Sequence, residues 1–148
     1  MLKIITLISF LSLFISSCNY HLKENVNLVN AVVIATEKNE FVELLEKSFN
    51  KQTTAKIKLI IGAESLKETA VVYDNNGGAS EVKLTLTIPT KITNLKGDKI
   101  YFDDSLSVSN IVAIPSNVQS KAIIKQQTYQ NLRNNLLETL SLKLQNIH

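Results

Sequence analysis

The sequence contains one cysteine, two histidines and no tryptophan among its 148 residues. A lone cysteine cannot form an intramolecular disulfide bond. The histidines are His21 and the last residue, His148, so they share no short motif. Cys18 and His21 have the spacing of a nucleophile–base or metal-binding pair, but no third partner lies close to them in the sequence. The sequence therefore lacks the patterns of a disulfide-stabilised or metal-binding protein.

Motifs for catalysis and for phosphate binding are also missing. No serine lies in a Gly-x-Ser-x-Gly motif, which would expose a nucleophile on a strand-to-helix turn. Gly77-Gly78 is not followed by the lysine and helix start of a phosphate-binding loop. The adjacent pair Asp103-Asp104 fits an exposed strand edge better than a metal or acid/base site. We therefore predict that the protein is not an enzyme and needs no cofactor.

The charge balance argues against nucleic-acid binding. Sixteen basic and thirteen acidic residues give a net charge of +3, and no basic run alternates with aromatic residues. A hydrophobic content of 45% with 20% charged residues is typical of a globular domain. The composition thus predicts a folded domain that binds no nucleic acid.

The first 18 residues have the pattern of a lipoprotein export signal. Lys3 supplies a positive charge, and the apolar run from Ile4 to Ile15 is too short to span a bilayer as a helix. Ile15-Ser16-Ser17-Cys18 then resembles a bacterial lipobox, in which the cysteine is lipidated. The alternative is an ordinary signal peptide with a chance cysteine near its end. We predict a signal peptide over residues 1–17, a lipidated tether over 18–28 and one domain over 29–148.

Hydrophobic periodicity predicts four strands and two helices. The clearest strand is Val82–Ile88, where apolar residues alternate with Lys83, Thr85 and Thr87, so that one face is exposed to water. Turn residues at Asp74–Gly78 and Lys96–Asp98 separate the strands on either side. A second predicted strand, Val29–Ala35, is expected to be buried. A third begins at Lys56–Ile61, is interrupted at Gly62 and Glu64–Lys67, and resumes at Thr69–Tyr73. The last runs from Ile100 to about Ile114.

The predicted helices are amphipathic. The first begins after the N-cap Asn39 and ends near Asn50. The second covers about Asn117–Gln145, contains no proline or glycine, and has a possible capping box at Ser116 and Gln119. Its predicted buried stripe consists of Ala122, Tyr129, Leu132, Leu136, Leu140 and Leu144, widened by Leu137. These elements predict an α+β fold: two helices packed on one face of a four-stranded, mostly antiparallel sheet.

Three segments in this order resemble the lipopolysaccharide-assembly lipoprotein family, LptE. They are Cys18–Lys23 after the lipobox, the alternating strand Glu81–Ile88, and Leu106–Ser109 with the following loop and helix to Leu144. The resemblance implies a non-catalytic, two-helix, four-stranded α/β sandwich that has no cofactor apart from the covalent lipid on Cys18 and belongs to a family whose members can bind lipopolysaccharide. It also implies anchoring to the outer membrane, because Asn19 is not the aspartate associated with inner-membrane retention. Family members plug the lumen of the LptD β-barrel and assist its assembly.

The resemblance also raises the question of lipopolysaccharide binding. Family members use basic residues near two loops that here read Tyr73–Gly78 and Ala113–Asn117, without lysine or arginine. Nearby candidates to replace them are Lys83, Lys91, Lys121 and Lys125, although such lysines are usually only solvated. Two other classes stay open: an auxiliary lipoprotein subunit of a transport or barrel-assembly complex, and, with less support, a surface lipoprotein enzyme.

Overall fold

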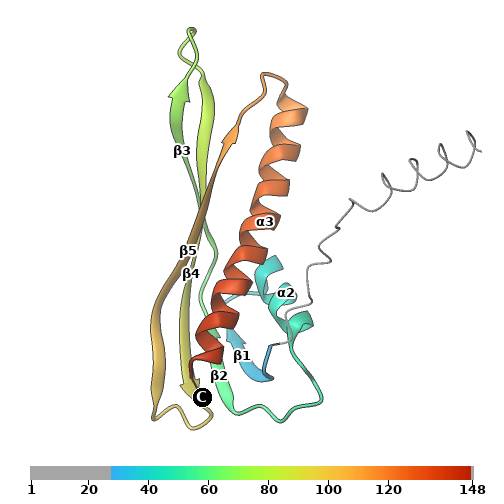
Figure 1. The fold of residues 1–148 in the computed structure, drawn as a ribbon, viewed down its shortest axis with the longest axis vertical. Helices are drawn as coiled ribbons and strands as arrows, with labels where there is room; N and C mark the ends of the chain where they lie inside the picture. Colours follow the sequence, from blue (N-terminus) through green and yellow to red (C-terminus); the bar gives the residue numbers. More distant parts are fainter. Residues whose placement is uncertain (1–27, 148) are drawn as a thin grey trace, which may run out of the picture.

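The computed structural model describes residues 28–147, which form one five-stranded sheet with two helices on one of its faces (Figure 1). This arrangement confirms the predicted α+β fold. In chain order the elements are β1 (Ala31–Ala35), α2 (Glu40–Ser48), β2 (Ile57–Ile61), β3 (Ser65–Tyr73), β4 (Ala79–Asn94), β5 (Ile100–Ala113) and α3 (Val118–Gln145).

Strand β4 is the centre of the sheet. It pairs antiparallel with β5 along nearly its whole length, so β5 occupies one edge of β4. The other edge is shared by β3, which pairs with the first half of β4, and by β2, which pairs with the second half. β1 extends the sheet beyond β2 as its parallel neighbour. The sheet therefore has five strands, where the sequence predicted four, because β2 and β3 are separate strands that share one edge of β4.

The break between β2 and β3 falls opposite Pro89 of β4. Ile61 pairs with Thr90 and Ser65 with Thr87, so Pro89 lies between the two ladders. Proline has no N–H to donate to a ladder, and Gly62 N donates instead to the carbonyl of Pro89 at 2.8 Å. A Cβ on Gly62 would meet the Pro89 ring at 2.9 Å, so only glycine fits this close approach. The predicted interruption is confirmed, but it is shorter than expected, because the polar residues from Ser65 onward already belong to β3.

The core lies between the sheet and the helices. Val82, Leu84, Leu86, Ile88 and Ile92 of β4 are at most 2% exposed, as their alternation predicted. The same core contains Leu59 and Ile61 of the neighbouring strand β2 and, facing the sheet, Phe41 and Leu45 from α2 and Leu132, Leu136, Leu137, Leu140 and Leu144 from α3.

Two burial predictions were wrong. Ala122 is exposed, so the buried stripe of α3 does not reach the start of the helix, and Tyr129 is only partly buried. Near Ala122 a polar contact replaces apolar packing, because Lys125 of α3 forms an ion pair with Glu68 of β3. Strand β1 was predicted to be buried, but Val32 and Ile34 are 44% and 48% exposed. No helix covers that face of the sheet in the described part of the chain.

The predicted turns and one of the two predicted caps are confirmed. Asn39 caps α2, because its side chain accepts a hydrogen bond from Val42 N at 3.0 Å. In the β3–β4 turn, the Asp74 carboxylate accepts from Asn76 N and Gly78 N at 2.8 and 2.9 Å, and Gly77 has φ +80°. The capping box at Ser116 was wrong. Asn117 is the N-cap of α3, and its side chain accepts from the backbone N–H groups of residues 119 and 120.

Candidate functional site

The outer face of the sheet carries hydroxyl groups in register across β4 and β5. Thr85 pairs with Ser109 and Thr87 with Ser107, while Ser105 pairs with Pro89. The Thr87 and Ser107 hydroxyl groups lie 3.0 Å apart and share a hydrogen bond. Because the two helices pack on the opposite face, no described element covers this surface (Figure 1). We call it the hydroxyl face: Thr85, Thr87, Ser105, Ser107 and Ser109.

The hydroxyl face is uncharged but has a charge at each end of its β4 side. Lys83 precedes Thr85, and Lys91 lies beyond Pro89. Lys91 Nζ is 2.7 Å from Asp103 Oδ2, so that lysine is neutralised by its cross-strand neighbour. Asp103 and Asp104 are exposed on β5, as the sequence predicted. A surface of hydroxyl groups between one lysine that is unpaired among the described residues, Lys83, and one neutralised lysine, Lys91, suits polar or water-mediated contact with another protein surface.

The four lysines predicted to contact lipopolysaccharide do not form one cluster. Lys83 and Lys91 project from the outer face of β4, whereas Lys121 and Lys125 lie on α3, which packs on the other face. Lys125 Nζ bonds Glu68 Oε2, on the helix-facing side of β3. Two of the four charges are thus already neutralised within the fold. Lys83 and Lys121 form no ion pair with other described residues.

The two loops at which the family uses basic residues lie at the same end of the molecule. The β3–β4 turn and the β5–α3 loop are joined near their bases by the hydrogen bond from Ile114 N to Ser80 O, 2.8 Å long. Around these loops, large apolar side chains are exposed: Val72 at 42%, Tyr73 at 65%, Ile111 at 52% and Val118 at 80%. We call this the apolar end, and its loops lack basic residues, as the sequence predicted.

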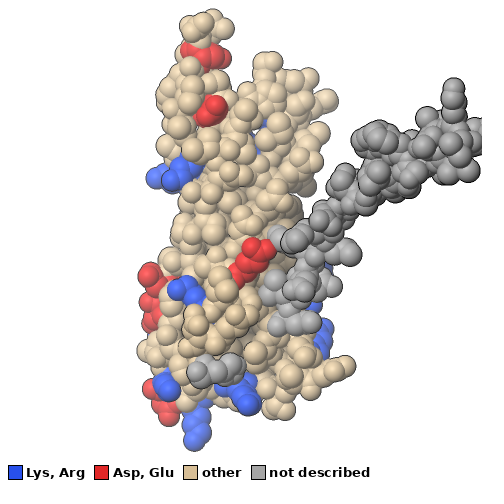
Figure 2. Space-filling model, in the orientation of Figure 1, with Lys and Arg blue, Asp and Glu red and all other residues tan. Residues whose placement is uncertain are grey.

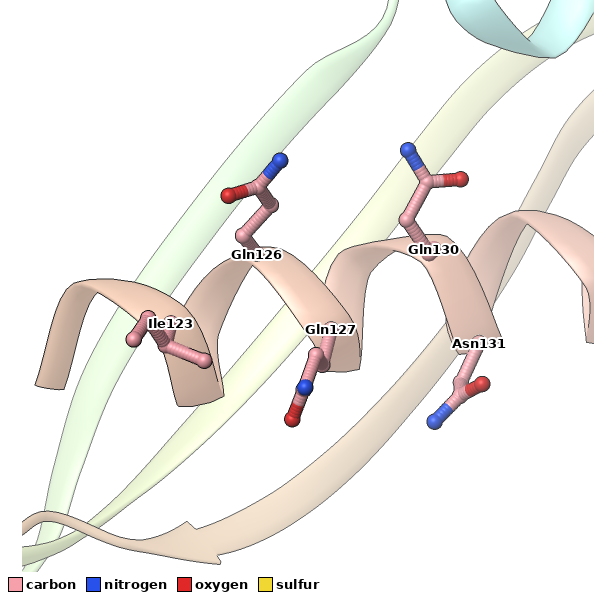
Figure 3. Close-up of a pocket in the computed structure, with 5 residues that line it drawn as sticks. All are labelled: Ile123, Gln126, Gln127, Gln130 and Asn131. Carbon is pink, nitrogen blue, oxygen red and sulfur yellow. The ribbon is translucent and has the colours of Figure 1, made fainter. Parts of the chain in front are cut away.

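A second polar surface lies on α3. An open depression of about 530 Å³ is lined by Ile123, Gln126, Gln127, Gln130 and Asn131, four of which carry side-chain amides (Figure 3). Gln126 and Gln130 project to one side of the helix, and Gln127 and Asn131 project to the other. Amides donate and accept hydrogen bonds without charge. This surface is therefore also suited to a polar protein partner.

A buried ion pair was missed by the sequence analysis. Arg133, the only arginine in the sequence, is 8% exposed. Its Nε lies 3.1 Å from Glu64 Oε1 and its Nη2 lies 2.8 Å from Glu64 Oε2, while its Nη1 bonds Glu40 Oε2 at 2.7 Å. Glu64 also accepts from Phe41 N at 3.1 Å. The side-chain hydrogen bond to Glu64 raises the pKa of Arg133 above its usual value.

This ion pair has a structural role. It joins α3 to the start of α2 and to the break between β2 and β3, away from the hydroxyl face. The sequence did contain one sign of this ion pair. Its single arginine lies between Leu132 and Leu136 of the predicted stripe, where a charged residue must find a partner.

Tyr129 lies on the same helix. Burial, with a contribution from Glu68, raises the pKa of its hydroxyl group.

The described residues offer no metal site and no membrane-spanning helix. Over residues 28–147, no group of three or more His, Cys, Asp or Glu side chains lies close enough to hold an ion. No helix in this range is long and apolar enough to cross a membrane. The predicted lipidation site, Cys18, lies outside the described residues. Lipid attachment therefore remains a prediction from the sequence.

Comparison with known proteins identifies the family to which the chain belongs. The family model for LptE, described as lipopolysaccharide-assembly, matches residues 26–144. The chain belongs to the LptE family. The match covers β1 to α3 up to Leu144, so the hydroxyl face and the buried ion pair both lie within it. No curated protein matches the sequence significantly.

Solved structures agree with this family in fold. The rare lipoprotein B from Shewanella oneidensis superposes with a TM-score of 0.62 at 13% identity, covering 82% of this chain and 98% of that one. The uncharacterized lipoprotein B from Nitrosomonas europaea gives 0.57 at 10% identity, covering 78% and 79%. A minor lipoprotein from Acinetobacter baumannii gives 0.56 at 15% identity, covering 81% and 90%. At such identities the likeness establishes the LptE-type fold alone.

Proposed function

We propose that this LptE-family chain is an outer-membrane lipoprotein that plugs the lumen of an LptD-type β-barrel and assists its assembly. In this role it acts by occupying a partner and not by catalysis. The barrel in turn inserts lipopolysaccharide into the outer membrane. The chain is held on the periplasmic side of that membrane by lipid on Cys18.

The observation that carries the proposal is the uncovered hydroxyl face. A polar sheet face that no helix covers suits a partner surface that is itself polar. The interior of a transmembrane β-barrel is polar and hydrated. Hydroxyl groups such as those of Thr87 and Ser107 can bond such a wall directly or through water. The amide-lined depression on α3 offers the same chemistry on the opposite side of the molecule.

The anchor supports the same proposal. Lipid on Cys18 would keep the domain at the membrane that contains the barrel. Binding then becomes effectively intramolecular, which raises the local concentration and relaxes the affinity that the interface requires. Weak polar contacts over a large surface would suffice under these conditions.

The role of the hydroxyl face can be tested by measuring how much of the barrel co-purifies with this lipoprotein. The variant Thr87→Lys/Ser107→Lys places two long cations on this face and should sharply reduce recovery of the barrel–lipoprotein complex. The matched control, Thr87→Ser/Ser107→Thr, keeps both hydroxyl groups and should give normal recovery. Circular dichroism should show both variants folded, because the two positions lie outside the core.

Depletion of the whole protein provides the functional readout. The proposal expects less assembled barrel and less lipopolysaccharide at the cell surface. Normal levels of both after depletion would contradict it. The protein would then fit better as a lipoprotein subunit of a different transport or barrel-assembly complex.

A further inference from the structure

Lysines gather at the end of the molecule opposite the apolar end. The α2–β2 loop carries Lys51 and Lys56, β2 begins with Ile57-Lys58, and the β4–β5 turn carries Lys96 and Lys99. Pairing brings these segments together, because Ile57 lies opposite Asn94 and Lys58 opposite Thr93. Lys58 Nζ also lies 4.0 Å from the position that a Cβ would take on Gly97. We call this the basic end: Lys51, Lys56, Lys58, Lys96 and Lys99.

The basic end contains the whole positive excess of the sequence. Its segments include one acid, Asp98, whose carboxylate is bonded by Asn94 Nδ2. Five lysines against one aspartate leave eleven basic and twelve acidic residues for the rest of the chain, out of sixteen and thirteen. Figure 2 shows lysines on the lower end of the molecule and few charges on the upper part of the same face. All of the five except Lys58 are exposed.

The chain enters the fold beside this end. Asn50 N donates to Leu28 O at 2.8 Å, and Leu28 N donates to Ser48 O at 2.9 Å. Asn30 Nδ2 donates to Thr53 O at 2.7 Å, in the loop that carries Lys51 and Lys56. Nine residues, 19–27, separate Leu28 from Cys18, so the connection has ten Cα–Cα steps. Even fully extended they reach about 35 Å, so an anchored Cys18 keeps the basic end close to its membrane.

We propose that the basic end binds the anionic phospholipid headgroups of the leaflet in which Cys18 is anchored. This inference rests on the anchoring in the proposed function. Lysines close to an anionic membrane surface each strengthen binding about fivefold. The contact sets the orientation of the domain: the basic end faces the leaflet, and the apolar end, at the far end of β4, points away from it.

Vesicle binding of the unlipidated mature chain tests this contact separately from the anchor. The probe is the chain 18–148 with Cys18→Ser, which retains every described residue and hence the whole core. It should sediment with vesicles of phosphatidylethanolamine and phosphatidylglycerol, but not with neutral phosphatidylcholine vesicles. Raising the salt to about 1 M shortens the screening length to about 3 Å and should abolish binding.

Matched variants locate the contact. Lys56→Gln/Lys96→Gln should lower partitioning into the anionic vesicles about thirtyfold, as expected for two lysines near the surface. The control Lys38→Gln/Lys67→Gln removes two exposed lysines elsewhere and should change it far less. Circular dichroism should show both variants folded.

Three results with phospholipid vesicles alone would overturn the proposal. They are equal binding to neutral vesicles, equal losses in the two double variants, and no sedimentation with anionic vesicles at all. A fourth result would also overturn the proposal. If Lys56→Gln/Lys96→Gln lost binding to lipopolysaccharide aggregates but kept binding to phosphatidylglycerol vesicles, the basic end would be a lipopolysaccharide-binding surface. Because no barrel is present, none of these results bears on the plug function.

Discussion

Arg133 of α3 and Glu64, at the break between β2 and β3, form a two-pronged ion pair across 69 residues of sequence, with N–O distances of 3.1 and 2.8 Å. Both side chains are about one-tenth exposed. The second partner of Arg133, Glu40, is 61% exposed. One guanidinium therefore makes a buried ion pair and an exposed one, and the two pairs should contribute differently to stability.

Breaking the buried pair should be costly. Glu64→Gln leaves the Arg133 charge without its main partner, and Arg133→Met leaves the buried Glu64 carboxylate with the Phe41 N–H but without a cation. Each should lower the free energy of unfolding by about 3–5 kcal/mol. Glu40→Gln removes the exposed partner and should cost no more than about 1 kcal/mol. Urea denaturation measures all three, and equal effects of Glu64→Gln and Glu40→Gln would contradict this assignment.

The leucine stripe of α3 gives a second stability prediction. Leu136 is fully buried, so Leu136→Ala should leave a cavity and cost about 2–5 kcal/mol. Leu142 lies on the same helix but is 62% exposed, and Leu142→Ala should change stability by less than about 0.5 kcal/mol. Thermal melts followed by circular dichroism make the comparison. An unchanged melting temperature for Leu136→Ala would mean that α3 is not part of the core.

Substitutions at the N-terminus of α3 test whether Asn117 or Ser116 caps the helix. Asn117→Ala removes the acceptor for two backbone N–H groups and should cost about 1 kcal/mol. Ser116→Ala should have almost no effect, because the Ser116 side chain does not cap the helix in this structure. If Ser116→Ala proved the more destabilising, the capping box predicted from the sequence would be restored.

Anchoring depends on Cys18. Cys18→Ala should release the protein from the membrane fraction while its circular dichroism spectrum and melting temperature stay unchanged, because the described fold begins at Leu28. Cell fractionation measures the release. Mass spectrometry of the native mature protein should find acyl chains on Cys18, and an unmodified thiol there would refute the lipobox assignment.

Lipopolysaccharide binding by this chain should depend on the unpaired lysines. We propose Lys83 and Lys121 for this role, because Lys91 and Lys125 are already paired with carboxylates. Because Lys83 and Lys121 lie on opposite faces of the fold, each is replaced alone, and Lys83→Gln or Lys121→Gln should weaken binding to purified lipopolysaccharide about fivefold. Lys91→Gln and Lys125→Gln are the matched controls and should weaken it less. The reverse order would show that the ion pairs open on binding.

Local patterns predicted much of the fold. The alternation in β4, the leucines of α3, the Asn39 cap and both turns are properties of neighbouring residues, so the sequence displays them directly. The sequence could not show that Glu64 meets Arg133, because that contact depends on how α3 lies across the sheet. The sequence likewise could not show that this end of α3 meets β3 through the ion pair of Lys125 with Glu68 while Ala122 stays exposed.

The candidate site was predicted only in part. The exposed side of β4 followed from its alternating threonines, but its continuation onto β5 required the register that places Ser107 opposite Thr87. The basic end was not visible in the sequence, because its lysines are spread over segments that only the pairing of β2 with β4 brings together. Surfaces of this kind are set by long-range register and not by local pattern.

The break opposite Pro89 separates two strands of unequal protection on one edge of β4. Beyond it, toward the apolar end, β4 itself is buried at Val82, Leu84, Leu86 and Ile88, but its neighbour β3 is an edge strand with most residues exposed. Amides of β3 should exchange with solvent through local opening, while those of β2, which lies between β1 and β4, should need nearly global unfolding. Hydrogen exchange should therefore differ between β2 and β3, and the β3–β4 turn can fluctuate, or accept inserted residues, without loosening the half that carries α2.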